Sequence, residues 1–326
     1  MSVHEGPLPS TEVEGGPENA SAELARALVA ASGGTVEAVL LYGSHLHGAN
    51  PDRHSAHDFV VIVSEYPAFY SALRDAGEIH RPPALMSALA RVLAPNVIAF
   101  TPEGGTAGIA KCLVVSGDDF QRALGEQPPD HFILARMVQD VGLVWVQDGA
   151  TRERIEGLLD GARARVLSWV GPFLQEPFDA EALGRRMLEV CYRAEFRPEA
   201  RNRAALVFDG QRDHFRTVLP AGLEAAVARG TLEKSPDGMR FATPPSRSER
   251  RRWRWHFVRS KARTTARWFK HIVTFDNWLP YVTRKVERRT GSKIELTRLE
   301  RRWPLIFLWP RVVRVLLVRP EREESK

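Results

Sequence analysis

Apolar residues recur along the N-terminal part of the chain in short runs that predict alternating helices and strands. Residues 21–32 have apolar positions at helical spacing and end at two glycines, which predicts a helix. Later runs predict strands at 35–42, 59–63, 96–100 and 109–115, with helices at 67–75 and 82–93. We therefore expect an α/β (α+β) domain with a mixed sheet over residues 21–125.

The pattern becomes helical after this domain. Helical spacing predicts helices at about 130–140, 152–170, 179–194 and 212–229, and prolines interrupt the region at positions 172, 177, 198 and 220. Residues 126–243 are therefore expected to form a helical second domain. The stretch Ser235-Pro236-Asp237-Gly238 predicts a turn, and Pro244-Pro245 predicts a linker into a C-terminal region over 244–326.

Charge separates this C-terminal region from the rest of the chain. Residues 246–326 hold 23 Lys/Arg against 8 Asp/Glu, a net charge of +15, which leaves −9 for residues 1–245. Six of the eight tryptophans also lie there. Basic residues interleaved with tryptophan are typical of an anionic membrane interface. Nucleic acid remains an alternative, because arginine contacts phosphate and aromatic rings stack on bases.

The last apolar segment, residues 303–319, favours the membrane. It is broken by Pro310 and is shorter than the roughly 20 apolar residues that a spanning helix needs. We expect it to lie in or on a bilayer, as a peripheral anchor, whereas the alternative is a helix that docks on the core. The residues expected to contact the membrane are Trp303, Phe307, Trp309, Arg311 and Arg314.

Composition adds three expectations about the setting. Residues 1–20 are rich in Glu, Pro, Gly and Ser without a positive, apolar leader, which predicts a disordered tail and no signal peptide. The two cysteines form no C-x-x-C pair, so a reducing cytoplasm is the simplest setting. Four histidines at positions 45, 47, 54 and 57 match no usual metal-ligand spacing, and we interpret them as loop residues.

The strongest chemical signal is Tyr42-Gly43-Ser44 at the end of a predicted strand, followed by Asp58 at the start of the next. Glycine lets backbone approach a triphosphate, and the N–H groups of a following helix N-terminus bind phosphate. A carboxylate on the adjacent strand can hold Mg²⁺ against the same phosphates. Many nucleotide-transferring sites use two carboxylates, but position 56 is Ala, and an ordinary strand-to-turn junction is the structural alternative.

Several cations lie in positions suited to anions. Lys111 interrupts an apolar strand, where an ammonium group requires an anionic partner or an edge position. Arg136 and Arg197 occupy predicted helices or helix ends, and guanidinium groups suit phosphate oxygens as well as solvent. Glu195 could be a second metal ligand, a base, or a salt-bridge partner of Arg193 or Arg197.

Short blocks from residue 39 to 225 resemble one family in the same order. They are Tyr42-Gly43-Ser44, Asp58 with the apolar residues after it, 109–116, 132–137, 192–197 and 213–216. They are similar to the mitochondrial-type CDP-diacylglycerol synthases, the translocator assembly and maintenance family of phosphatidate cytidylyltransferases. That family also lacks the first carboxylate. The chain departs from it at Cys112-Leu113, at Ala135 and at Glu195, where the family has Tyr-Gly, Gly and Asp.

The resemblance implies a nucleotidyltransferase fold and a Mg²⁺-dependent enzyme of phospholipid (cardiolipin) biosynthesis. CTP and phosphatidate in an anionic membrane would give CDP-diacylglycerol and pyrophosphate, and no nucleic acid partner is expected. Together with the composition of the chain, we therefore expect a peripheral protein at the cytoplasmic face of a membrane. The implied roles are catalysis by Asp58 and Lys111, metal binding by Asp58, nucleotide binding by Tyr42, Gly43, Ser44 and Arg136, and substrate-phosphate binding by Tyr192, Glu195 and Arg197. Two alternatives stay open: a nucleotidyltransferase with a soluble or protein acceptor, and a catalytically lapsed adaptor for membranes or nucleic acid.

Overall fold

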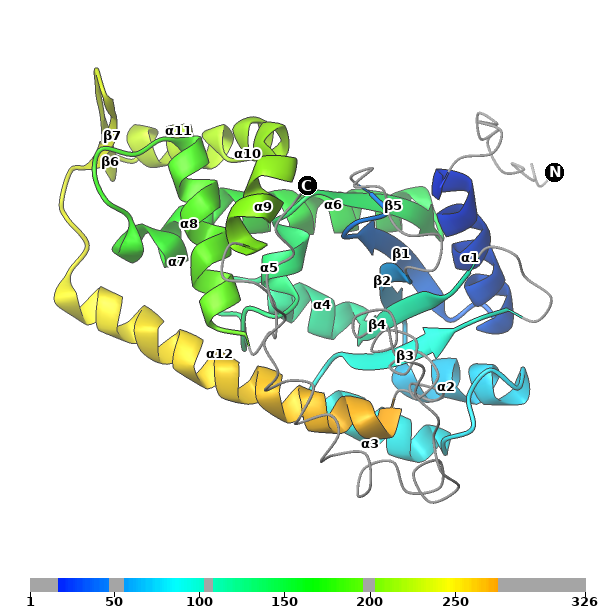
Figure 1. Ribbon diagram of the computed structural model, residues 1–326. Coiled ribbons are helices and arrows are strands. Elements are labelled where there is room, and N and C mark those ends of the chain that lie inside the picture. The colour runs from blue at the N-terminus through cyan, green and yellow to red at the C-terminus, as the bar shows by residue number, and fades with distance from the viewer. Residues whose placement is uncertain (1–16, 47–55, 103–107, 196–202, 275–326) are drawn as a thin grey trace, which may run out of the picture.

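The computed structural model describes residues 17–46, 56–102, 108–195 and 203–274 (Figure 1). Five strands form the main sheet: β1 Val36–Tyr42, β2 His57–Val63, β3 Asn96–Phe100, β4 Ala110–Ser116 and β5 Val141–Val146. A hairpin is formed by β6 Leu232–Ser235 and β7 Gly238–Phe241. The helices are α1 Pro17–Ala31, α2 Tyr66–Asp75, α3 Pro83–Val92, α4 Gly117–Leu124, α5 Leu134–Met137, α6 Gly149–Ala164, α7 Val166–Val170, α8 Ala180–Arg193, α9 Arg203–Gly210, α10 Arg212–Val218, α11 Pro220–Ala228 and α12 Arg247–Thr274.

The main sheet is mixed, in the order β3-β4-β2-β1-β5. The β2 and β4 strands run parallel, whereas β1 pairs antiparallel with both β2 and β5, and β3 pairs antiparallel with β4. The predicted α+β class with a mixed sheet is therefore confirmed. The antiparallel order brings the end of β1 beside the starts of β2, β4 and β5.

Helices cover both faces of the sheet (Figure 1). On one face, α1, α2 and α3 bury a core that includes Leu24, Phe69 and Met86 against alternate strand residues. On the other face, the opposite strand residues pack against α4, α5 and α6 in a core that continues through α8 to α11. The core on the second face therefore joins the sheet to the C-terminal helices.

The predicted single helix over 130–140 was wrong, and no element was predicted for the apolar run at 141–146. Within 130–140 only the four residues of α5 are helical, and Val141–Val146 form the edge strand β5. This run of six residues carries no periodicity that separates a strand from a buried helix segment. Pairing with β1, about a hundred residues earlier, decides the outcome and takes the sheet beyond residue 125.

Several smaller differences follow local chemistry. Helix α1 begins at Pro17, within the segment predicted as a disordered tail, and proline suits the first turn of a helix. The helix predicted over 212–229 is divided at Pro220 into α10 and α11. The predicted turn at 235–238 joins β6 to β7, a hairpin that the sequence analysis did not predict.

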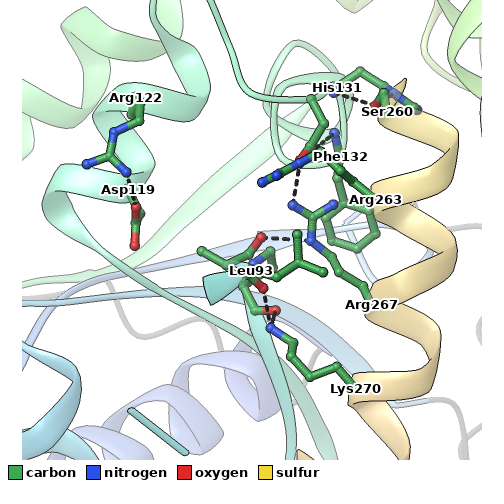
Figure 2. A network of polar contacts seen from close by, with 12 residues as sticks. Leu93, Asp119, Arg122, His131, Phe132, Ser260, Arg263, Arg267 and Lys270 are labelled. Atoms are coloured by element: carbon green, nitrogen blue, oxygen red, sulfur yellow. Dashed lines mark hydrogen bonds and ion pairs between the residues drawn. The ribbon is translucent and has the colours of Figure 1, made fainter. Parts of the chain in front are cut away.

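Helix α12 runs alone along one side of the molecule (Figure 1). Its inner face is apolar at the start, where Trp253 and Phe257 join the core, and polar towards its end. Figure 2 shows Arg263, Arg267 and Lys270 projecting from this end towards the body of the protein. The Lys270 ammonium donates to the carbonyls of Leu93 and Pro95, just after α3, where helix C-terminal carbonyls favour a cation.

Among the described helices, none is both long and apolar enough to cross a membrane. The predicted anchor at 303–319 lies outside the described residues, and so do Trp303, Phe307, Trp309, Arg311 and Arg314.

Candidate functional site

Three of the predicted site residues lie side by side across the sheet. The register pairs Tyr42 with Asp58 and Asp58 with Lys111 on the adjacent strands. Their strand neighbours Leu40, Val60 and Leu113 all belong to the core on the α4–α6 face. Because strand side chains alternate between faces, Tyr42, Asp58 and Lys111 form one row on that same face. The row lies at the sheet edge where β1 ends and β2 and β4 begin.

Gly43 brings the backbone close to this row. Its φ is +85°, a conformation that glycine adopts without steric cost, and it opens a hydrogen-bonded turn in which Leu46 N donates to Gly43 O. A Cβ at this position would lie 3.3 Å from Asp58 Oδ2. The glycine therefore leaves room for the Asp58 carboxylate. Ser44 lies in the same turn and is partly buried, and residues 47–55, which follow this turn, lie outside the described residues.

Lys111 and Asp58 form an ion pair, with 3.3 Å between Lys111 Nζ and Asp58 Oδ1. Their side chains are 36% and 30% exposed, so both are accessible from solvent. The anion that Lys111 was expected to require thus includes a carboxylate of the chain itself. An accessible lysine–aspartate pair of this kind offers one cation for phosphate oxygens and one carboxylate for a metal ion.

Arg136 extends the row of charge onto α5. Its guanidinium lies near the Tyr42 side chain and forms an ion pair with Glu195, with 3.0 Å between Arg136 Nη1 and Glu195 Oε1. Burial and the Asp58 charge raise the pKa of Tyr42, although Lys111 and Arg136 oppose this. Tyr42 therefore stays a neutral phenol beside two cations.

Glu195 is the buried partner that orients Arg136. Only 5% of its side chain is exposed, and its two carboxylate oxygens accept from Arg136 Nη1 and Nη2. The Arg136 side chain also lies over the Phe132 ring, at 3.9 Å from the ring centroid. Salt-bridge formation by Glu195 was among the sequence interpretations, but sequence alone did not indicate Arg136 as its partner.

A further set of contacts connects this pair to α12. His131 Nε2 lies 3.7 Å from Glu195 Oε1, and the His131 backbone N–H and Nδ1 both contact Ser260 Oγ. Asp130 accepts from Arg263 Nε at 2.8 Å and from Arg267 Nη2 at 2.6 Å. Helix α12 thus holds the segment that leads into α5, as Figure 2 shows for His131, Phe132 and Arg267. No motif indicated this role for Asp130 or His131, because their partners lie about 130 residues away.

His57 lies on the opposite face of the sheet from Asp58. It is a buried residue of β2, not a loop residue as predicted, and its ring stacks on His45 with 3.8 Å between centroids. Its Nδ1 also contacts Ser21 Oγ of α1 at 2.8 Å. Burial lowers the pKa of His57 to about 4, so this ring is a neutral packing element.

Two other predicted site residues are Tyr192 and Arg197. Tyr192 is partly buried near the end of α8 and packs against the same core as Tyr42. Arg197 lies outside the described residues. The structure therefore brings together Tyr42, Gly43, Asp58, Lys111, Arg136 and Glu195, which come from five separate segments of the sequence.

The donor set suits a metal ion only in the presence of a phosphate ligand. Among the described residues there is no group of three or more His, Cys, Asp or Glu side chains that could hold a metal ion. Mg²⁺ is commonly held by one or two carboxylates together with substrate phosphates. Asp58, accessible and adjacent to the Gly43 turn, fits that limited role.

The sequence matches no protein-family model, and a search of curated proteins gives no significant relative. The chemistry of the site is therefore argued from its residues. One accessible carboxylate, one accessible lysine and an arginine held by a buried glutamate lie around a glycine turn, and such a group suits a polyphosphate with its counterion.

Proposed function

We propose that the chain is a CTP:phosphatidate cytidylyltransferase with a nucleotidyltransferase-like domain, related to the family that its sequence blocks resemble. The observation that carries this proposal is the row of Tyr42, Asp58 and Lys111 beside Gly43. Residues from separate blocks of the resemblance meet there at one sheet edge. A nucleotide-transfer site requires a carboxylate and a cation close together beside a backbone turn, and this row supplies them.

In the proposed reaction, a phosphate oxygen of phosphatidate attacks the α-phosphorus of CTP. A new P–O bond forms, the bond between the α-phosphorus and the bridging oxygen breaks, and pyrophosphate leaves with that electron pair. The attacking phosphate is already ionised, so no protein base is required. Catalysis then depends on positioning and on stabilising charge around the phosphorus.

Each residue of the site would have a separate role in this reaction. Lys111 would donate to phosphate oxygens in exchange for its bond to Asp58, and Arg136, held by Glu195, would bind a second phosphate oxygen. Asp58 would hold Mg²⁺, which when bound neutralises charge on the triphosphate. The Gly43 turn lets the triphosphate approach the backbone. Specificity for cytosine and phosphatidate rests on the resemblance alone.

The experiment is incubation of the purified full chain with labelled CTP, Mg²⁺ and phosphatidate in mixed micelles, scoring label that becomes lipid-soluble. ATP, GTP and UTP serve as matched nucleotides, and diacylglycerol, which lacks the attacking phosphate, serves as the matched acceptor. We expect label in lipid with CTP and phosphatidate only. Label that enters lipid equally well from ATP, GTP or UTP would replace this proposal with a broader nucleotidyltransferase.

One observation favours the lapsed adaptor as a second candidate. Lys111 already has a carboxylate partner in Asp58, which is also how a purely structural ion pair would look. An adaptor would bind CTP weakly or not at all and would transfer no label under any of these conditions.

A further inference from the structure

The outer face of α12 carries exposed aromatic and aliphatic side chains that the site does not use. Trp255, Val258 and Phe269 are 68%, 58% and 62% exposed, and Trp268 is 44% exposed. The opposite face of the same helix is buried against the protein. Trp253 and Phe257 lie on this face, and it also makes the polar contacts with Asp130 and His131. Helix α12 therefore has one face that packs on the protein and a second face, also with apolar side chains, that is exposed.

The outward residues form one continuous stripe. At 3.6 residues per turn, Trp255, Val258, Ala262, Ala266 and Phe269 fall within an arc of about 80° and extend along about 21 Å of helix. All five are exposed. A stripe this long is not a set of scattered surface apolar residues.

Basic side chains flank the stripe on both sides. Arg252 and Arg259 lie towards one side, Arg254 and Lys261 lie towards the other, and all four are exposed. A central apolar stripe between rows of cations is the arrangement of a helix that lies in an anionic lipid interface. A nucleic-acid-binding helix would place cations at the centre of its contact face, where α12 has Val258 and Phe269.

We propose that the outer face of α12 docks onto an anionic lipid surface, with Trp255, Val258 and Phe269 in the interface and the flanking arginines on lipid phosphates. The segment 303–319 of the same chain is a less suitable occupant, because it carries Arg311 and Arg314 opposite an already basic face. The role of this docking rests on the proposed function. The inner face of α12 holds the segment that leads to Arg136, so docking of the outer face on lipid would bring the site to its lipid substrate.

The test is flotation of the full chain with vesicles of phosphatidylcholine alone or mixed with phosphatidylglycerol, without nucleotide. Phosphatidylglycerol is anionic but is not the proposed substrate, so the result is independent of transferase activity. The variant is Trp255→Ala/Phe269→Ala, and its matched control is Val92→Ala/Leu206→Ala, which removes exposed apolar side chains from other helices. Circular dichroism confirms that each protein is folded.

We expect wild type and control to bind the anionic vesicles equally and the α12 variant to bind at least about tenfold more weakly. Arg254→Gln/Arg259→Gln should weaken binding by about fivefold for each charge and reduce its dependence on salt. Unchanged vesicle binding by the Trp255/Phe269 variant would overturn the proposal and assign binding elsewhere in the chain. Absence of vesicle binding by the wild type would also overturn it. The same holds if the Trp255/Phe269 variant binds vesicles normally and instead loses only binding to an oligonucleotide, or only self-association into a dimer.

Discussion

At the scale of single residues, the proposed site depends on buried groups that fix the accessible ones. Arg136 reaches Tyr42 because Glu195 and the Phe132 ring hold its guanidinium. Removing one partner of a buried ion pair leaves the other charge without compensation, which costs far more than the loss of an exposed pair. Glu195 is therefore expected to act as a positioning residue, with consequences for both stability and phosphate binding.

Glu195→Gln should lower the free energy of unfolding by about 1–3 kcal/mol and weaken CTP binding, because Arg136 loses its carboxylate partner. Urea denaturation measures the first effect and titration calorimetry the second. The control is Glu189→Gln, which removes the partly exposed pair with Arg186 and should cost less than about 1 kcal/mol. Equal effects of the two variants would contradict the positioning role.

His131 makes the same region sensitive to acid. Burial lowers its pKa to about 4, although Glu195 and Asp130 oppose this and Arg136 and His256 add to it. The folded state therefore binds fewer protons than the unfolded state between pH 6.5 and pH 4, and stability should fall as pH falls through that range. The contribution amounts to about 2 kcal/mol between pH 7 and pH 5.

Urea denaturation at pH 7 and pH 5 checks this expectation. His131→Asn should be less stable at pH 7, since it loses packing around Ser260, but should lose less stability on acidification than wild type does. A pH dependence identical in both proteins would show that His131 does not contribute to the loss of stability in acid.

At the scale of elements, glycines set how closely the C-terminal helices pack. A Cβ on Gly184 of α8 would lie 2.9 Å from Phe215 Cγ of α10. Gly157 of α6 is also helical, but a Cβ there would meet nothing within 4 Å. The two positions therefore separate the effect of close packing from the effect of helix propensity.

Gly184→Ala should destabilise the protein by about 1–3 kcal/mol through overpacking. Gly157→Ala should be neutral or stabilise it by up to about 1 kcal/mol, because alanine is the better helix former. Guanidinium denaturation of both variants measures the difference. Stabilisation by Gly184→Ala would mean that α8 and α10 do not pack as described.

Elements differ in how well the sequence predicts them, for physical reasons. Strands β1 to β4 are long apolar runs bounded by turn residues, so their positions were predicted within two residues. Strand β5 depends on pairing with β1, about a hundred residues earlier, and the four-residue strands of the β6–β7 hairpin carry weak local signals. In the site, Asp58 and Lys111 were recognised from unusual residues in apolar strands. The Glu195–Arg136 pair could not be predicted, because only the fold brings α8 to α5.

At the scale of the whole molecule, α12 connects the most basic part of the described chain to the site. Arg267 is 2% exposed and depends on Asp130, which is 3% exposed, for its charge partner. The same carboxylate accepts from Arg263. The charges of Arg263 and Arg267 near the end of α12 are therefore compensated by one buried acid.

Asp130→Asn should loosen α12 by about 3–5 kcal/mol, because Arg267 would be left buried and only partly compensated. Limited trypsin digestion followed by mass spectrometry should then show faster cleavage after Arg259 and Lys261. Asp118→Asn, at an exposed position of α4, is the control. Unchanged cleavage rates would mean that α12 is held mainly by its apolar N-terminal half.

The most direct test of the central claim is transfer of label from CTP to phosphatidate by wild type, Asp58→Asn and the control Asp75→Asn, which changes an exposed acid at the end of α2. We expect wild type and Asp75→Asn to form lipid-soluble cytidylate at equal rates. Asp58→Asn should be slower by at least about a hundredfold while retaining its circular dichroism spectrum. Transfer at the wild-type rate by folded Asp58→Asn, or no transfer by any of the three proteins, would contradict the assignment of this row of residues to nucleotide transfer.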